Sequence, residues 1–180
     1  DLYNSTRHPD QDADTLQTIK MVTEQNDRLS KMVKTLLDMS ELQTVGRDEK
    51  IIVDALIDEV LEDLEPLAQE KNIKLIGKCK DITMVGSDIL IYRLVYNLVE
   101  NAIKYNHLGG QVTVIAYQKE KHIYLSVEDT GSGIPEDFRE RVFEPFFRVD
   151  KSRSRELGGV GLGLALVREI VRVHDGSITV

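Results

Sequence analysis

"NLVENAIKYN", residues 97–106, combines two asparagines and a lysine with a line of apolar residues. The residues around it predict a helix, although an asparagine inside a helix costs about 0.5 kcal/mol or more relative to alanine. Side chains at positions i and i+4 lie on one face of a helix, so Asn97 and Asn101 form a polar stripe that Lys104 continues. Beside this stripe runs an apolar line, namely Ile91, Leu94, Val95, Leu98 and Ala102. The pattern predicts a helix with the core on one side and a polar ligand on the other.

The composition is that of a soluble globular protein. The chain has 180 residues, 41% of them hydrophobic and 30% charged, which is enough for one core and a peripheral element. A net charge of -8 argues against nonspecific binding, so we expect no nucleic-acid partner and no membrane contact by this part. The single cysteine, Cys79, excludes an intrachain disulfide and fits a reducing compartment. No apolar run approaches the about 20 residues that span a bilayer, and no signal peptide is visible.

A long helix is predicted from Leu16 onward, after a polar loop at residues 1–14. Its apolar positions alternate in steps of three and four, which is typical of the seam of a coiled coil or helical bundle. The seam residues are Ile19, Val22, Asn26, Leu29, Val33 and Leu36. An ordinary amphipathic helix that packs on its own domain would show similar spacing. We favour a helix whose partners are another helix and another chain.

The remaining pattern predicts an α+β fold. Helices that cover one face of a mixed sheet give two layers, which is the economical arrangement for such a pattern. The expected elements are a linker at 44–50, a helix at 54–71 that Pro66 kinks or shortens, a strand at 72–79, a helix N-cap at 86–88, a hairpin at 109–129, a helical turn after Pro135, a helix at 162–174 and a final strand at 177–180. The domain boundaries that follow are 1–43, 44–50 and 51–180.

Three polar motifs have chemistry that converges on one ligand. The asparagines of 97–106 offer neutral oxygen ligands that suit Mg²⁺, and Lys104 adds a positive charge for phosphates. In "GGVGLGLAL", 158–166, glycines precede a helix whose free N–H groups favour an anion. In "DTGSGIP", 129–135, Asp129 needs a partner such as a purine amino group, and the glycines leave room for the ring. Each motif alone is weak, but together they predict a Mg-ATP site without a Walker loop.

The order of these motifs, with "FEPFFR" (143–148) between the last two, closely resembles the catalytic ATP-binding domain of bacterial sensor histidine kinases. This family belongs to the wider ATPase group of gyrase, Hsp90 and MutL. The resemblance covers nearly the whole chain and implies a two-layer α/β sandwich of the Bergerat type, preceded by a long bundle helix. The segment ending "RLSKMVKTLLDMSELQ" (28–43) resembles the second helix of the dimerisation and phosphoacceptor hairpin of these kinases.

The resemblance implies a role for each matching residue. Asn97 and Asn101 match the asparagine box, with Asn101 as the direct Mg²⁺ ligand, and Lys104 matches the lysine that contacts phosphate. The other matches are Tyr105 beside the nucleotide, Asp129 on the adenine amino group, Gly131 and Gly133 in the first glycine box, Gly159, Gly161 and Gly163 at the hinge of a flap, and Arg148 near the transferred phosphate. We therefore expect ATP and Mg²⁺ as ligands, with Asn97, Lys104 and Arg148 in catalysis.

Two neighbouring groups of side chains have open interpretations. Lys151, Arg153 and Arg155 lie in the expected lid, either touching phosphate or simply solvated. Phe143, Phe146 and Phe147 are core residues or help to dock the catalytic domain on the hairpin. We expect Phe146 or Phe147 to be partly exposed.

The residue at position 97 favours a kinase over a hydrolase. In the gyrase and Hsp90 group, a glutamate four residues before the metal asparagine activates water, and here this position is Asn97. An amide is not a general base at neutral pH. Glu100 is acidic, but it lies about a turn away and is interpreted as a solvated surface charge. Catalysis would then consist of positioning and charge stabilisation, with a histidine as the acceptor.

The acceptor motif of the family, His-Glu/Asp-x-x-Thr/Asn-Pro, is missing. His8 precedes a proline, and His107, His122 and His174 fall inside the catalytic domain, so none is assigned as the acceptor. The chain starts without methionine and stops within an expected strand, which indicates a piece of a longer protein. We expect it to bind Mg-ATP without phosphorylating itself.

The expected partners are a response regulator, the protein's own phosphoacceptor hairpin and a second copy of the full-length protein. This part would lie in the cytoplasm, with the full-length protein anchored in the bacterial inner membrane. Three alternatives remain open: a gyrase- or Hsp90-like ATPase, a degenerate ATP-site module used for protein contacts, and a serine-directed kinase of related fold.

Overall fold

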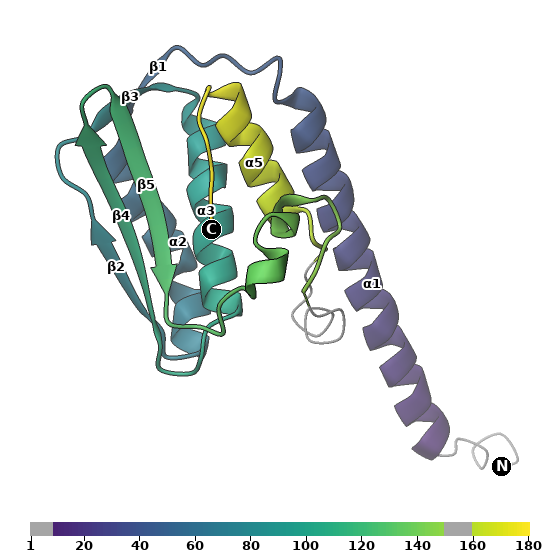
Figure 1. The fold of residues 1–180 in the computed structure, drawn as a ribbon. Coiled ribbons are helices and arrows are strands. Elements are labelled where there is room, and N and C mark those ends of the chain that lie inside the picture. Colours follow the sequence, from purple (N-terminus) through teal and green to yellow (C-terminus); the bar gives the residue numbers. More distant parts are fainter. Residues whose placement is uncertain (1–8, 150–159) are drawn as a thin grey trace, which may run out of the picture.

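One long helix projects from a body of two layers in the computed structural model, which describes residues 9–149 and 160–180 (Figure 1). The helices are α1 (Pro9–Glu41), α2 (Val53–Glu70), α3 (Asp88–Lys104) and α5 (Gly163–Val173), and the short helical turns are η1 (Glu136–Phe138) and η2 (Arg141–Phe143). The strands are β1 (Glu49–Ile52), β2 (Lys74–Lys78), β3 (Thr83–Gly86), β4 (Gln111–Lys119) and β5 (His122–Asp129).

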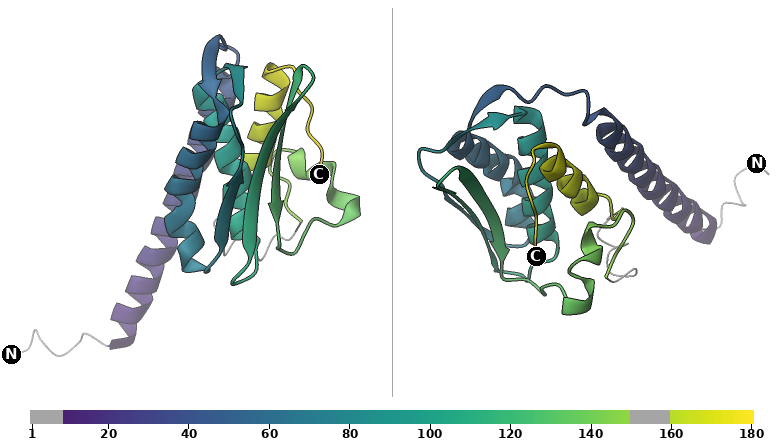
Figure 2. Two further views of the ribbon diagram at one scale, coloured as in Figure 1. Left: turned by 90° about the vertical axis from the view of Figure 1, so that its left-hand side faces the viewer. Right: turned by 45° about the horizontal axis from the view of Figure 1, so that its top comes forward.

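The main sheet is mixed and has the order β2-β4-β5. Strand β2 runs parallel to β4, and β4 pairs with β5 as the predicted antiparallel hairpin. Helices α2 and α3 pack on one face of this sheet, and α5 lies beside α3 in the same layer (Figure 2). The α+β two-layer sandwich expected from the sequence is therefore confirmed.

The core between the layers is aliphatic. Its largest fully buried side chains include Ile57 and Leu64 of α2, Ile103 of α3 and Ile170 of α5. Helices bury one stripe and sheets one face, so the polar stripe of α3 is left at the edge of this core. That edge is where the candidate site lies.

Several sequence expectations were wrong in detail. Helix α1 begins at Pro9 rather than after residue 14, because proline has a fixed φ and no N–H and suits the first helical position. Strands β1 and β3 were missed because four-residue strands show almost no alternation. The linker expected at 44–50 is two residues too long, since Glu49 and Lys50 pair with Gly86 and Val85.

Three further details concern helix and strand ends. Pro66 lies inside α2, which continues to Glu70. Ser87 occupies the N-cap position of α3 as predicted, but its side chain makes no cap hydrogen bond. Its backbone N–H donates instead to Nε2 of His174 at 3.1 Å. The expected final strand is wrong, because residues 176–180 join none of the ladders in the described part of the chain.

Helix α1 leaves its seam uncovered. Ile19, Val22, Leu29, Val33 and Leu36 are between 46% and 63% exposed, which a helix packed along its own domain would not show. At its end the helix is anchored, since Leu42 is buried in the core and Met39 packs against that core. Among the described helices, none combines the length and apolarity needed to cross a membrane.

Candidate functional site

A cavity of about 1220 Å³ opens between α3 and β5 on one side and the phenylalanine motif, both ends of α5 and the C-terminal residues 174–180 on the other. It exceeds the roughly 300–1,000 Å³ of most small-molecule sites. Seven of the residues selected from the sequence line it: Asn101, Tyr105, Asp129, Gly133, Arg148, Gly161 and Gly163. Its walls are apolar side chains such as Leu98, Leu125 and Val127. The fold thus gathers residues from distant motifs around one apolar cavity with a polar end.

The two asparagines of α3 do different things. Asn97 donates from Nδ2 to the carbonyl oxygen of Arg93 at 2.7 Å. A Cβ added to Gly163 would lie 2.8 Å from Asn97 Oδ1, so Asn97 packs against the first residue of α5. Asn97 does not line the cavity, whereas Asn101, one turn later, does. Asn101 is therefore the asparagine whose amide is available to a ligand in the cavity.

Lys104 is engaged within its own helix. Its Nζ lies 2.7 Å from Oε1 of Glu100, and both side chains are about three-quarters buried, with 21% and 26% exposed. Lys104 does not line the cavity in this arrangement. To contact a phosphate, its ammonium group would have to turn from Glu100 or share its three N–H donors between the two partners.

The first glycine loop packs closely against the end of α3. Asp129 Oδ1 accepts a hydrogen bond from Gly131 N–H at 2.7 Å, and Ser132 N–H donates to the carbonyl of Tyr105 at 3.4 Å. A Cβ on Gly131 would lie 2.5 Å from that carbonyl oxygen, so only glycine fits. Gly131 therefore shapes the loop, and it does not itself line the cavity.

A buried polar residue that the sequence did not single out supports this loop. Asn106 is 4% exposed, and its Oδ1 accepts from Thr130 Oγ1 at 3.0 Å. Its Nδ2 donates to the carbonyl of Gln111 at 3.0 Å. Asn106 thus joins α3 to the start of β4 and the end of β5. The only hint in the sequence is a polar residue directly after the asparagine helix.

The second glycine loop is tied to the phenylalanine motif. Phe146 N–H donates to the carbonyl of Gly161 at 2.7 Å. Gly161 has φ of +79°, and a Cβ there would lie 2.8 Å from the carbonyl oxygen of Phe147. Glycine is therefore required on both counts. The cavity meets the N-terminal end of α5 at Gly163.

The three phenylalanines divide as expected. Phe143 is buried, Phe147 is half-buried beneath the guanidinium of Arg141, and Phe146 is 53% exposed. The prediction that Phe146 or Phe147 is partly exposed is confirmed. Gly159, Lys151, Arg153 and Arg155 lie outside the described residues.

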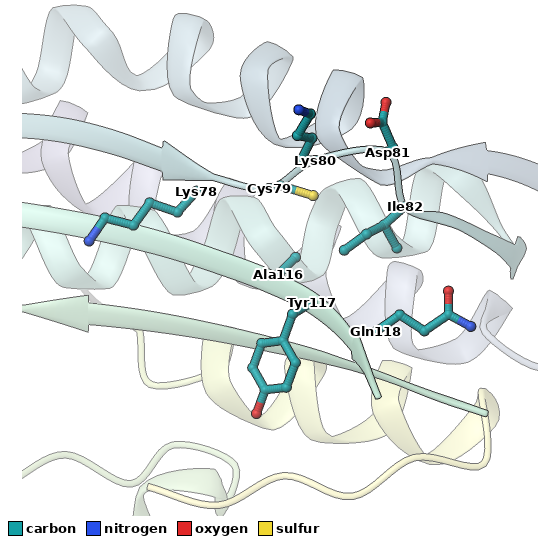
Figure 3. Close-up of a pocket in the computed structure, with 8 residues that line it drawn as sticks. All are labelled: Lys78, Cys79, Lys80, Asp81, Ile82, Ala116, Tyr117 and Gln118. Atoms are coloured by element: carbon teal, nitrogen blue, oxygen red, sulfur yellow. The ribbon is translucent and has the colours of Figure 1, made fainter. Parts of the chain in front are cut away.

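A second hollow, of about 560 Å³, lies at the carboxyl end of β2 (Figure 3). Lys78, Cys79 and Lys80 line one side, and Ala116, Tyr117 and Gln118 of β4 line the other. Burial, reinforced by the negative charge of Asp54, raises the pKa of the Cys79 thiol. None of the residues that the motifs selected contributes to this hollow. The larger cavity is therefore the candidate site.

Comparison with known proteins assigns the family. Residues 86–180 match the model of the histidine kinase-, DNA gyrase B- and HSP90-like ATPases. The sensor histidine kinase RppB of Synechocystis is 37% identical over 164 residues, which are 88% of this chain and 36% of RppB. The mycobacterial sensor histidine kinase MprB has a similar structure, with a TM-score of 0.65 and 32% identity over 73% of this chain and 83% of that one.

A further similar structure is the histidine kinase ThkA in complex with the response regulator TrrA. Its TM-score is 0.71 at 25% identity, over 91% of this chain and 46% of that one. The chain belongs to the histidine kinase-, gyrase B- and HSP90-like ATPase family, as its resemblance predicted. Within this family it is homologous to the ATP-binding catalytic domain of sensor histidine kinases. It spans about a third of the length of RppB, at 36%.

Proposed function

We propose that the cavity binds ATP with Mg²⁺ and that the domain transfers the γ-phosphate to a histidine on a helical hairpin. One observation carries this proposal: residues from four separate segments line one cavity with an apolar interior and a helix N-terminus at one end. Apolar walls suit a purine ring, and the N-terminus of α5 at Gly163 suits phosphate. We assign Asp129 to the adenine amino group and Tyr105 to the side of the nucleotide.

Mg²⁺ fits this site as a shared ligand of protein and nucleotide. The described residues contain no group of three or more His, Cys, Asp or Glu side chains that would hold a metal by themselves. Mg²⁺ typically takes one or two protein oxygens, with phosphates and waters as the other ligands. Asn101 would supply the protein oxygen. Asn97 would become a second ligand only if its side chain moved away from the Arg93 carbonyl and Gly163. When bound, Mg²⁺ would offset the charge of the phosphates.

Phosphate transfer, rather than hydrolysis, is supported by the surroundings of α3. Asn97 stands where the hydrolases of this group carry a base, and its amide is bonded to the Arg93 carbonyl. The carboxylate of Glu100 is occupied by Lys104. Lys104 and Arg148 would stabilise the charge on the transferred group once the nucleotide is bound.

A reconstitution experiment tests this function. The chain is mixed with an isolated hairpin that carries the acceptor histidine and with ATP labelled at the γ-phosphate. Acid-labile, alkali-stable phosphate on the hairpin is the expected product. Absence of transfer, despite measured ATP binding, would contradict the kinase proposal, and steady release of phosphate without any hairpin would favour the gyrase- or Hsp90-like alternative.

Asn101→Ala tests the metal site separately. Calorimetry with Mg²⁺ and with EDTA should show that this variant loses the Mg-dependent part of ATP binding. Asn26→Ala, on the exposed seam of α1, is the matched control and should bind as the wild type does. Unchanged Mg-dependence in Asn101→Ala would remove Asn101 from the metal site.

The partners of the whole protein are part of the same proposal. ThkA is in complex with a response regulator, and we infer a response regulator as the final phosphate acceptor here. The exposed seam of α1 supports a homodimer through the hairpin. Anchoring of the full-length protein in the inner membrane is proposed from the resemblance, and reading the encoded sequence upstream of Asp1 tests it.

A further inference from the structure

Helix α1 contacts the catalytic domain mainly near its C-terminal end. The seam residues nearer the N-terminus of the helix are exposed, whereas Leu42 is buried and Met39 packs on the core. The helix also contacts α5. With 33 residues, α1 is about 50 Å long at 1.5 Å per residue. A small rotation at its anchored end would therefore displace its far end by many ångströms.

A charged pair lies at this anchored end. Arg93 Nη1 of α3 is 2.8 Å from Asp38 Oδ1 of α1, and the side chains are only 27% and 15% exposed. Solvent and salt screen such a pair less than a fully exposed one. Three other ion pairs, Lys104–Glu100, Arg141–Glu144 and Arg172–Glu169, join residues three or four positions apart. The Arg93–Asp38 pair instead joins two elements far apart in the sequence.

Within α3, the backbone of the same arginine contacts Asn97, one turn further along the helix. Its carbonyl oxygen accepts a hydrogen bond from Asn97 Nδ2 at 2.7 Å. Asn97 in turn packs against Gly163, the first residue of α5. A short series of contacts therefore runs from Asp38 of α1, through Arg93 and Asn97, to the helix end that meets the cavity.

From these contacts we propose that Arg93 and Asp38 form an orientation latch, an ion pair that fixes the angle between α1 and the catalytic domain. Leu42 and Met39 hold the end of the helix in place, but apolar contacts are not directional. An arginine–carboxylate pair is directional, and it supplies the angular restraint. Because the proposed function assigns α1 to the acceptor hairpin, the latch would also set where the cavity lies relative to that hairpin, a consequence that rests on that function.

The angle is measured with two spin labels on the whole chain. Lys20→Cys on α1 and Lys121→Cys in the β4–β5 turn, both exposed, carry the labels in a Cys79→Ser background. Dilution with unlabelled protein suppresses distances between copies. The intact latch should give one narrow distance distribution. Asp38→Arg and Arg93→Asp should each broaden or shift it, and the double variant, which restores the pair with its charges exchanged, should narrow it again.

Controls separate the latch from general damage. Glu169→Arg breaks a pair confined to α5 and should leave the distribution narrow. Asp38→Asn and Arg93→Gln remove the ion pair without introducing repulsion, and they should broaden the distance distribution too. Thermal melting shows whether each variant is folded. A distribution that stays narrow in the single variants, or stays broad in the exchanged pair, would overturn the proposal. The measurement needs neither ATP nor an acceptor, so its failure is distinguishable from failure of the proposed function.

Discussion

At the scale of single residues, Gly163 shows how a missing side chain makes room for a site. An alanine there would bring its Cβ to 2.8 Å from Asn97 Oδ1, at the point where α5 meets the cavity. The backbone conformation of Gly163 is helical, so an alanine can adopt it without backbone strain, and its helix propensity is higher by about 1 kcal/mol. The residue is glycine because of space and not because of backbone strain.

Gly163→Ala should therefore separate binding from stability. We expect ATP to bind about tenfold more weakly, equivalent to about 1.4 kcal/mol, because Asn97 or the start of α5 must move. The melting temperature should stay unchanged or rise. Calorimetry and thermal melting measure the two effects. Gly77→Ala is the control, since its Cβ would make an ordinary contact at 3.4 Å with Leu61, far from the motifs. Equal ATP affinity in both variants would contradict this account of Gly163.

Tyr92 gives a prediction about pH. Burial, together with a short hydrogen bond from its hydroxyl to Asp63, raises the pKa of Tyr92 far above its usual value. A tyrosine ionises at about pH 10 in the unfolded chain, so above that pH the folded state holds the proton more tightly. Stability that depends on neutral Tyr92 is therefore complete below about pH 10 and is lost as the pH rises further.

Denaturant unfolding between pH 8 and 11 measures this loss. Tyr92→Phe should show a shallower decline of unfolding free energy above pH 10. Asp63→Asn should flatten it too, since it removes the charge that holds the proton. A decline as steep as that of the wild type in both variants would show that other groups govern the alkaline range.

At the scale of elements, helix α3 contains a residue, Glu100, that competes with a phosphate for Lys104. The pair with Glu100 spans one turn of the helix, and such pairs contribute about 0.3–0.5 kcal/mol. A phosphate in the cavity would compete with Glu100 for the charge of Lys104. The free energy of this pair therefore opposes nucleotide binding by a small amount, which can be measured.

Glu100→Gln should tighten ATP binding by about twofold, because the free energy of the broken pair no longer opposes the contact with phosphate. The gain should shrink at high salt and vanish in the double variant with Lys104→Ala. Calorimetry at low and high salt measures both. The same variant tests the hydrolase alternative: loss of a steady ATPase activity in Glu100→Gln would identify Glu100 as a base and contradict its role as the partner of Lys104.

Helices α3 and α5 are also joined by His174 at the end of α5. Its Nε2 accepts from Ser87 N–H at 3.1 Å, and its Nδ1 lies 2.8 Å from the carbonyl oxygen of Ile170. These two contacts together require the neutral ring with its proton on Nδ1. His174, which the sequence did not assign as a phosphoacceptor, therefore links the end of α5 to the start of α3, the two helices that form the site.

At the scale of the whole molecule, the exposed seam of α1 predicts self-association. Leu29 and Val22 lie at the centre of that seam and are 58% and 63% exposed. Leu29→Asp with Val22→Asp should convert dimers into monomers, because charges at seam positions are costly to bury. Sedimentation equilibrium measures the change. Lys34→Asp, outside the seam, is the control and should leave the dimer intact. A wild-type chain that is monomeric at high concentration would contradict the seam prediction.

Elements with strong local patterns could be predicted from the amino-acid sequence. Helix α3, the β4–β5 hairpin and α5 follow from periodicity and from glycine, proline and asparagine at fixed spacings, because such preferences act over a few residues. The same spacing identified the motifs, and of the ten selected residues that lie in the described part of the chain, seven line one cavity. The family resemblance rested on the order of these motifs.

The partner that each polar side chain faces depends on how the elements pack together. Asn97 and Asn101 share a face of α3, yet α5 covers the first and the cavity opens at the second. Lys104 pairs with Glu100, and Asp38 meets Arg93 across 55 positions of sequence. The spacing along a helix fixes the face on which a residue lies, but the element packed against that face is chosen by burial of distant apolar residues, which no local pattern encodes.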